Sequence, residues 1–438
     1  MKRIHIALLG IGLLLFPFMP LQAQWTLEKC IEHAVEQNYT VKQKMLEMES
    51  KHWQLASAKM SMAPSLSASV GQNLDFGRAP TAKGIIENQS QSTTSLGVSL
   101  NMPLFEGLRN VNQTKSAKID VQAAIYDLQQ VKENIEMTVT AYYLQVLLCE
   151  ELLEMTKTQA ELSKLQIDRV EKLVKNGRSP ESELYTAKAA HAADQYTITE
   201  ATNNLRLALL DLRQLLNIQD SHFAIAPIQD NDFETQLQQE FLVTNIIHQG
   251  MQNRPSLKSL QKRIEMSELA IKMARSGWYP SLYFSASYGT GYYYSFQNDM
   301  ANVPLSTQFN NNSRGMVSLS LSIPIFDKLN TYHNVQLNKL QLKSAEIQLE
   351  ETKLNLTKEI EQAYTTALNA KDKYFAAISS KEAAKVALEY EEVKYAAGSS
   401  TTFAYNEAKN RYEKAQSDLI QSKYNFLIRK KILEFYGK

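Results

Sequence analysis

The stretch SLGVSLNMPLFEGLRN at residues 95–110 returns in altered form as MVSLSLSIPIFDKLNT at residues 316–331, an offset of 221 positions. Further along, KLVKNGRSPESELYTAKA at 172–189 pairs with VKYAAGSSTTFAYNEAKN at 393–410 at the same offset. Internal self-similarity at a fixed spacing is stronger evidence of architecture than any single local motif. The sequence therefore predicts two copies of one unit, each with a helix, two strands, a long helix, a turn and a returning helix.

Each copy contains two segments in which apolar and polar residues alternate strictly. The strands are expected at about 65–76, 95–105, 281–296 and 315–326, with Ser, Gly and Asn on one face of each. A period of two over ten or so residues predicts long strands with one apolar face. Small uncharged polar groups suit the inside of a barrel, and an apolar face with Tyr and Phe near its ends suits lipid. A soluble β-sandwich is the alternative.

Four strands cannot close a membrane barrel alone, because an open sheet edge cannot lie in lipid. Either the chain forms oligomers, or the strands lie outside a membrane. The segments at 77–90 and 298–313, between the strands of each pair, are polar and rich in turn residues. They are expected to be loops at the outer face of a barrel.

The remainder of each copy is predicted to be helical. Residues 108–175 and 328–396 contain neither Pro nor Gly. Apolar residues recur in both at every seventh position, interrupted in the first stretch only by Lys132. A heptad repeat of this kind predicts coiled-coil packing. Glycine just past a helix end is a C-cap signal, so each long helix is expected to end at Gly177 or Gly398. Ser179 is expected to cap the returning helix, with Pro180 at its first position.

These signals divide the chain into three parts. Residues 1–23 have a positive start, an apolar core and a Leu-Gln-Ala ending, which predicts a secretory signal peptide. The first repeat is expected at 24–241, with a helix hairpin at 108–216 and a linker at 217–241. The second repeat is expected at 242–438, with a helix hairpin at 328–436.

Composition excludes several classes of function. The chain has 47 basic and 46 acidic residues, so no electrostatic argument favours nucleic acid. The seven His residues are scattered along the chain and show no metal-ligand spacing. The sequence also contains no phosphate-binding glycine loop and no Gly-x-Ser-x-Gly motif. We therefore expect no enzyme, no catalytic residues, no metal and no cofactor. Cys30 and Cys149 fall in helical patterns and are expected to be small packed side chains rather than a disulfide bridge.

The duplicated order of strand pair, long helix, glycine turn and returning helix after a signal peptide resembles the TolC family of outer-membrane efflux proteins. The matching marks are Pro-Leu-Phe-Glu-Gly at 103–107, Pro-Ile-Phe-Asp-Lys at 324–328 and the two glycine turns. The resemblance implies a homotrimer in the outer membrane of a Gram-negative bacterium. Three chains would form a 12-stranded β-barrel on a long α-helical barrel that extends into the periplasm.

The same resemblance implies a function and partners. The trimer would be a passive exit duct of a tripartite efflux or type I secretion system, exporting small molecules or protein. Its partners would be a periplasmic adaptor (membrane fusion) protein, an inner-membrane pump and outer-membrane lipid. The alternative from another class is a structural protein, a periplasmic or surface coiled coil with a β-anchor. The duplicated strand pair argues against it, since a plain stalk does not require one.

The resemblance also implies two sets of site residues. The tip that contacts the adaptor would be formed by Gly177, Ser179, Gly398, Ser399 and Ser400. The periplasmic mouth would carry Glu183 and Glu407, six and nine residues past the two glycines. Thr186 and Ala404 occupy the other two of these four positions, and Asn176 and Ala397 stand where the family often has Val. The alternative for Glu183 and Glu407 is an ordinary solvated Glu near a helix start, favoured by the helix dipole.

Overall fold

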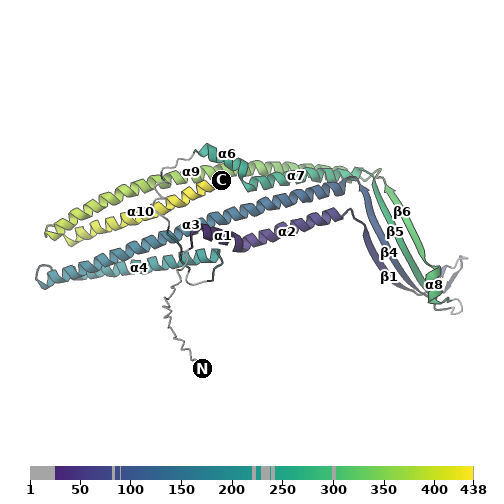
Figure 1. Cartoon of the computed structure of the whole chain (residues 1–438), viewed down its shortest axis with the longest axis horizontal. Coiled ribbons are helices and arrows are strands. Elements are labelled where there is room, and N and C mark those ends of the chain that lie inside the picture. Colours follow the sequence, from purple (N-terminus) through teal and green to yellow (C-terminus); the bar gives the residue numbers. More distant parts are fainter. Residues whose placement is uncertain are drawn as a thin grey trace, which may run out of the picture. The chain divides into compact units, whose positions relative to one another are not determined.

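The computed structural model describes residues 25–80, 84–88, 90–219, 223–227, 237, 242–297 and 302–437. The expected signal peptide at 1–23 lies outside the described residues, as does most of the expected linker. The described chain is mainly α-helical with a four-stranded sheet (Figure 1). Among these residues, no helix is both long enough and apolar enough to cross a membrane.

The chain divides into two compact units, which we call the helical unit and the sheet unit. The helical unit takes in the chain up to Asn38, residues 135–240 and residues 366–432; the sheet unit takes in residues 39–134, 241–365 and 433–438. Each unit contains segments of both sequence repeats, because the two longest helices, α3 (Arg109–Lys175) and α9 (Asn330–Ala396), each contribute to both. The compact units and the sequence repeats thus divide the chain in different ways.

The sheet joins the two repeats. It is antiparallel throughout and has the order β1 (Ser65–Asp75), β4 (Gln91–Glu106), β5 (Ser281–Ser295) and β6 (Arg314–Ser322), which lie side by side in Figure 1. The strands within each repeat pair with each other, and β4 of the first repeat pairs with β5 of the second.

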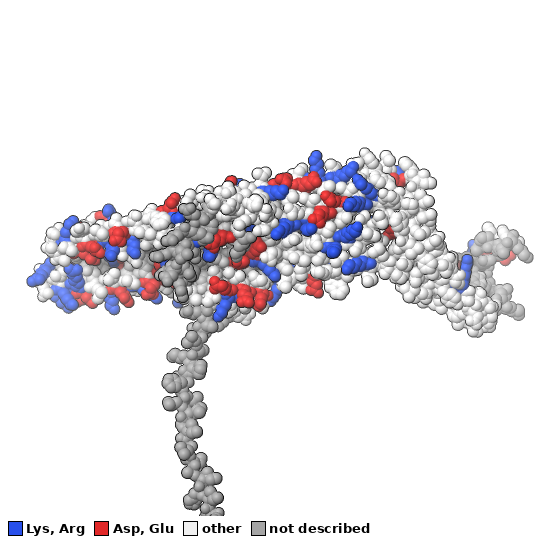
Figure 2. Space-filling view, turned by 45° about the horizontal axis from the view of Figure 1, so that its top comes forward, with Lys and Arg blue, Asp and Glu red and all other residues white. Residues whose placement is uncertain are grey.

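The register shows that the sheet has two chemically different faces. Leu66, Leu100, Ala286 and Val317 form one cross-strand row. The adjacent row contains Ser67, Ser99 and Ser287 and ends on β6 at Met316, and the hydroxyl oxygens of Ser67 and Ser99 are 2.8 Å apart. The alternation predicted from the sequence is therefore present across strands as well as along them. On the face drawn in Figure 2, the surface over the strands carries few charged residues.

The segments between paired strands contain small elements that the sequence pattern did not indicate. In residues 77–90, β2 (Arg78–Pro80) pairs with β3 (Ile86–Asn88), and in residues 298–313 lies helix α8 (Leu305–Asn311). The buried side chain of Gln308 accepts a bond from Tyr293 N at 2.9 Å and donates to Tyr293 O at 2.8 Å. This amide satisfies the β5 backbone beyond Gly289, where pairing with β6 has ended.

Four helices meet the sheet at the same end of its strands, because neighbouring strands are antiparallel. The helix α2 (Tyr39–Met60) leads into β1, and α7 (Pro255–Arg275), followed by the short 3-10 helix η1 (Ser276–Trp278), leads into β5. At the same end of the strands, β4 leads into α3 and β6 leads into α9. The opening helix of each repeat is split, α1 (Leu27–Gln37) from α2 at Asn38 and α6 (Val243–Asn253) from α7 at Arg254. Pro255 explains the second break, since it fits the first turn of a helix and disfavours helix before it.

The two turns from strand to helix hold their backbone in the left-handed region. The φ angles are 59° at Gly107 and 64° at Leu108, and 57° and 61° at the equivalent Lys328 and Leu329. A Cβ atom on Gly107 would lie 2.8 Å from Ser276 O, closer than real Cβ atoms approach. The first turn therefore requires glycine for both conformation and space, and the second tolerates Lys at a conformational cost.

We expect Gly107→Ala to destabilise the protein by at least about 2 kcal/mol, because left-handed strain and steric overlap add. Lys328→Gly is the matched variant, and it should stabilise by about 1 kcal/mol, because it removes the same strain without any overlap. Thermal unfolding followed by circular dichroism measures both changes. Equal midpoints for Gly107→Ala and the wild type would contradict this account.

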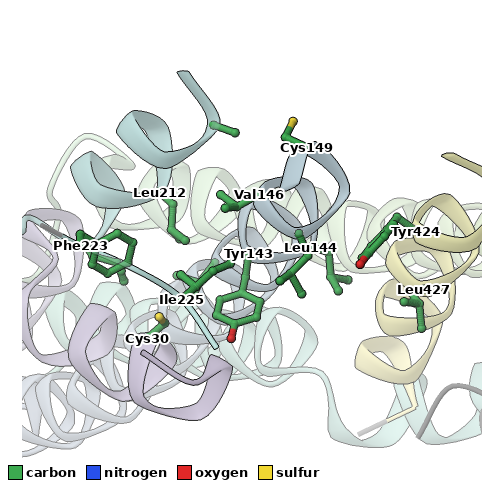
Figure 3. Close-up of a cluster of buried hydrophobic side chains, with 14 of the residues drawn as sticks. Cys30, Tyr143, Leu144, Val146, Cys149, Leu212, Phe223, Ile225, Tyr424 and Leu427 are labelled. Atoms are coloured by element: carbon green, nitrogen blue, oxygen red, sulfur yellow. The ribbon is translucent and has the colours of Figure 1, made fainter. Parts of the chain in front are cut away.

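The helical unit is organised around one buried cluster. It is formed by α1, α4 (Glu181–Leu215), α10 (Thr402–Tyr436) and parts of α3 and α9. Figure 3 shows this cluster with ten of its residues labelled. The Tyr143 hydroxyl lies 3.1 Å from Trp25 O and 2.5 Å from Ala226 O, next to an isolated bridge between Trp25 and Ile225. The described part of the linker thus packs into this core.

Both cysteines are buried in this cluster as free thiols, as the sequence predicted. Burial raises the pKa of the Cys30 thiol to about 12. The heptad positions Val139, Val146 and Leu153 of α3 are buried, which confirms the predicted packing stripe there. Ile125, on the same stride, is 46% exposed, so the stripe does not continue unchanged toward the start of α3.

Candidate functional site

The turn after each long helix has the same hydrogen-bonding pattern. At the end of α3, Gly177 N bonds to Val174 O at 2.9 Å and Arg178 N bonds to Leu173 O at 2.9 Å. At the end of α9, Gly398 N bonds to Tyr395 O at 3.1 Å and Ser399 N bonds to Lys394 O at 2.9 Å. These nested bonds define a Schellman cap.

Glycine meets the geometric requirement of both caps. The φ angle is 69° at Gly177 and 72° at Gly398, in the left-handed region that glycine adopts with least strain. A Cβ atom at either position would meet nothing within 4 Å. Both glycines and Ser399 are exposed, so the turns present backbone and small side chains to their surroundings.

The serines of the turns differ from expectation in their role. The sequence predicted that Ser179 caps the returning helix with Pro180 at its first position, and this was wrong. Pro180 itself is the N-cap residue of α4, and it provides no side-chain cap bond. The Ser179 hydroxyl bonds instead to the Glu183 carboxylate, and the Ser400 hydroxyl bonds to Glu391. In the second hairpin Thr401 provides the cap, accepting from Ala404 N at 3.2 Å.

A cavity of about 460 Å³ lies within the helical unit, lined by α3, α4, α9 and α10. Glu183 is half-buried and lines it, as do Thr402 and Tyr405. Glu407 does not line the cavity; it is exposed and accepts a bond from Arg411 at 2.5 Å. The structure therefore places the two predicted mouth residues in different surroundings.

Three charged side chains meet within the helical unit, and two of them, Lys409 and Glu413, line this cavity. Lys409 Nζ lies 3.6 Å from Asp194 and 3.3 Å from Glu413, and all three side chains are 15–18% exposed. The pKa of Glu413 is raised, mainly by burial, which outweighs the nearby Lys409. Burial also raises the pKa of Tyr405, whose ring stacks on Tyr395 at 5.1 Å. This group ties α4 to α10 within the helical unit.

Sequence reasoning did not single out this charged group. The repeat indicates only that Lys409 is equivalent to Lys188 in the first copy. Lys188 is exposed and lies over the Tyr185 ring. The available signal was a polar stripe at helical spacing on α10, comprising Tyr405, Lys409, Tyr412, Glu413 and Gln416, all of which line the cavity. Such a stripe on an otherwise coiled-coil helix indicates a polar contact rather than an apolar seam.

Aromatic residues gather at the loop end of the strands. Phe76 stacks on Phe296 with ring centroids 6.0 Å apart, and Tyr294 meets Phe296 edge-on at 5.5 Å. Aromatic residues at the end of an apolar strand face are typical of the boundary between lipid and water.

Comparison with known proteins agrees with this arrangement. A family model described as outer membrane efflux protein matches residues 30–217 and 246–435. The chain is 23% identical over 424 residues to the outer membrane protein TolC of Escherichia coli strain K12, covering 95% of this chain and 83% of TolC.

Solved structures share the fold across almost the whole chain. The structure of CusC has a TM-score of 0.78 at 17% identity and covers 94% of this chain and 92% of CusC. The CmeC outer membrane channel of Campylobacter jejuni has a TM-score of 0.76 at 19% identity, covering 94% of this chain and 85% of CmeC. The open state of the MtrE outer membrane channel of Neisseria gonorrhoeae gives 0.74 at 17% identity, covering 94% and 88%.

The duplicated chain, with its amphipathic antiparallel sheet and paired helical hairpins, has the fold of these outer-membrane channel proteins. The chain belongs to the outer membrane efflux protein family. It is an efflux channel protein of the Gram-negative outer membrane and reaches into the periplasm.

Proposed function

We propose that three copies of this chain form one passive duct, with twelve strands closed into a barrel and the helical hairpins forming a tube below it. The observation that carries the proposal is the sheet itself. It has one apolar face and, within the described residues, two open edges at β1 and β6. An open edge in lipid leaves backbone groups unsatisfied, so β1 of one copy is expected to pair with β6 of the next.

Two measurements on the purified protein test this proposal. Light scattering with the detergent subtracted should give the mass of three chains, and planar bilayers should show ion conductance. A monomer with intact strands would overturn the trimer. A trimer without conductance would favour the alternative, a β-anchored coiled-coil structural protein.

We propose further that the duct serves a tripartite efflux or type I secretion system and that the two glycine turns contact a periplasmic adaptor, which connects to an inner-membrane pump. Support comes from the matched Schellman caps, which end both long helices with exposed, small residues. Gly177, Ser179, Gly398, Ser399 and Ser400 form this proposed contact. The cargo of the duct is a small molecule or a protein.

Gly398→Trp should leave the trimer folded and abolish export. The indole has open space around its Cβ position, so it projects outward and obstructs a partner, while the backbone cost is about 1–2 kcal/mol. Gly398→Ala is the matched control, with the same backbone cost and little bulk, and it should retain export. Dye export in cells, read beside outer-membrane trimer levels, measures both. Equal losses in the two variants would assign the effect to backbone strain instead of a contact.

We propose that Glu183 and Glu407 line the periplasmic mouth, where three copies would supply up to six carboxylates. Such a ring favours cations and binds multivalent ions that block the current. The variant with Glu183→Gln and Glu407→Gln should lose cation selectivity and ion block without unfolding. Glu183→Gln alone should have the larger share, because the charge of Glu407 is compensated by Arg411. Single-channel reversal potentials decide this; wild-type values in the double variant would leave both residues as solvated helix surface.

A further inference from the structure

The helix segments that adjoin the sheet contain no acidic residue. They are residues 50–64, 107–119, 269–280 and 328–345, together 58 residues, and the acids that flank them are Glu49, Glu106, Asp120, Glu268, Asp327 and Glu346. They carry ten basic residues. Nine of these are exposed, and we call them the junction cations: Lys59, Arg109, Lys115, Lys118, Lys272, Arg275, Lys328, Lys339 and Lys343.

The junction cations all lie in the sheet unit, next to the end of the strands at which the four helices join the sheet. Figure 2 shows Lys and Arg gathered on the helical surface beside the strands. None of the nine forms an ion pair with a carboxylate among the described residues, whereas the tenth, Lys51, pairs with Asp120 at 2.9 Å. Of the acids that flank these segments, Glu106 accepts from Asn110, and Asp327 accepts from Thr331 N at 2.8 Å.

Exposed aromatic residues lie near the same ends of the strands. Trp278, Tyr279 and Tyr332 are 49–56% exposed and stand where the strands give way to helix. Along α9, Tyr332, Lys339 and Lys343 follow helical spacing, so this cation pair shares a face with an aromatic ring. Tyr279 follows α7 and η1 in extended backbone, four residues past Arg275. Trp and Tyr are enriched at the boundary of a membrane, and Lys and Arg just outside it reach for lipid phosphate.

The distances fit a lipid surface. Lys272 lies about 5 Å along the helix from the end of α7, Lys115 about 9 Å from the start of α3, and Lys339 about 14 Å from the start of α9. A headgroup region is roughly 5–8 Å thick, and charges act over a further Debye length of about 8 Å. Most of the junction cations therefore fall within the headgroup region or its electrostatic range.

We propose that the junction cations bind the phosphate groups of anionic phospholipids in the periplasmic leaflet of the outer membrane. They would fix the depth of the barrel and gather anionic lipid around it. This inference rests on the insertion of the strands into a bilayer and is independent of what the duct transports.

The test compares lipid preference in reconstituted full-length protein. Vesicles combine phosphatidylglycerol with phosphatidylcholine carrying brominated chains, which quench Trp fluorescence, and the relative lipid affinity follows from the quenching curve. The wild type should prefer phosphatidylglycerol about fivefold or more in 0.1 M salt, and the preference should largely disappear in 1 M salt, where the Debye length is about 3 Å. An equal affinity for both lipids, or a preference unaffected by salt, would overturn the proposal.

A charge-neutralised variant locates the effect. Lys115→Gln, Lys118→Gln, Lys272→Gln and Arg275→Gln together should reduce the preference by more than half, and either pair alone should reduce it less. The matched control neutralises four exposed cations of the helical unit, at Lys157, Lys164, Lys172 and Lys175, and should keep the wild-type preference. Bilayer conductance is recorded from the same preparations. A changed ion selectivity with unchanged lipid preference would place these cations in the lumen and refute lipid binding, whereas a wild type that binds phosphatidylglycerol without conducting would refute only the duct.

Discussion

Leu100→Arg is expected to prevent assembly of the protein in the outer membrane. Leu100 lies in the cross-strand row with Leu66, Ala286 and Val317 on the apolar face of the sheet. A cation there would have to lie in lipid, at a cost of about 2–4 kcal/mol in each chain near the bilayer midplane. The amount of trimer in outer-membrane fractions measures the effect.

Ser99→Arg is the matched control for Leu100→Arg. Ser99 is the preceding residue of β4 and lies in the polar row with Ser67 and Ser287, where we expect a water-filled lumen. This variant should assemble at close to wild-type levels and alter the conductance. Leu321→Arg and Ser320→Arg repeat the comparison on β6. Equal tolerance of Arg on both faces would contradict membrane insertion of the sheet.

The second large effect is expected from Lys409→Met, which should destabilise the helical unit by about 3 kcal/mol. Removal of the cation leaves Asp194 and Glu413 close together, largely buried and without a counter-charge. Lys188→Met, at the equivalent exposed position of the first repeat, should change stability by no more than about 0.5 kcal/mol. Thermal unfolding followed by circular dichroism at pH 7.5 compares the two, and similar midpoints would show that the buried group contributes nothing.

The pH dependence provides an independent check on the same group. Burial raises the pKa of Glu413 above its ordinary value of 4.5, so the folded protein holds this proton at a higher pH than the unfolded chain does. The contribution of Glu413 to stability therefore falls as the pH rises through its folded pKa. Glu413→Gln should raise the unfolding midpoint at pH 7.5 and leave it unchanged below about pH 4, where both states are protonated. A lower midpoint for Glu413→Gln at pH 7.5 would show that its attraction to Lys409 outweighs burial.

The sequence alone was sufficient for the long strands and the two long helices. Strict alternation in β4 and β5 predicts their two faces, because successive side chains of a strand point to opposite sides. Absence of Pro and Gly predicts the long helices α3 and α9, and Gly177 and Gly398 predict their ends, because few other residues enter a left-handed cap without strain. Each of these properties depends on residues close together in the chain, so the pattern carries it.

Only the tertiary structure decided which segments of the two repeats meet. Lys188 and Lys409 occupy equivalent places in the repeat, yet Lys188 is exposed and Lys409 is enclosed by Asp194 and Glu413. Glu183 lines a cavity and Glu407 lies outside it, although both follow a glycine turn closely. The pairing of β4 with β5 likewise involves residues far apart in the sequence. So does the gathering of the junction cations next to one end of the strands. Burial and charge pairing depend on the partner that packs against a residue, and a local pattern of side chains does not specify that partner.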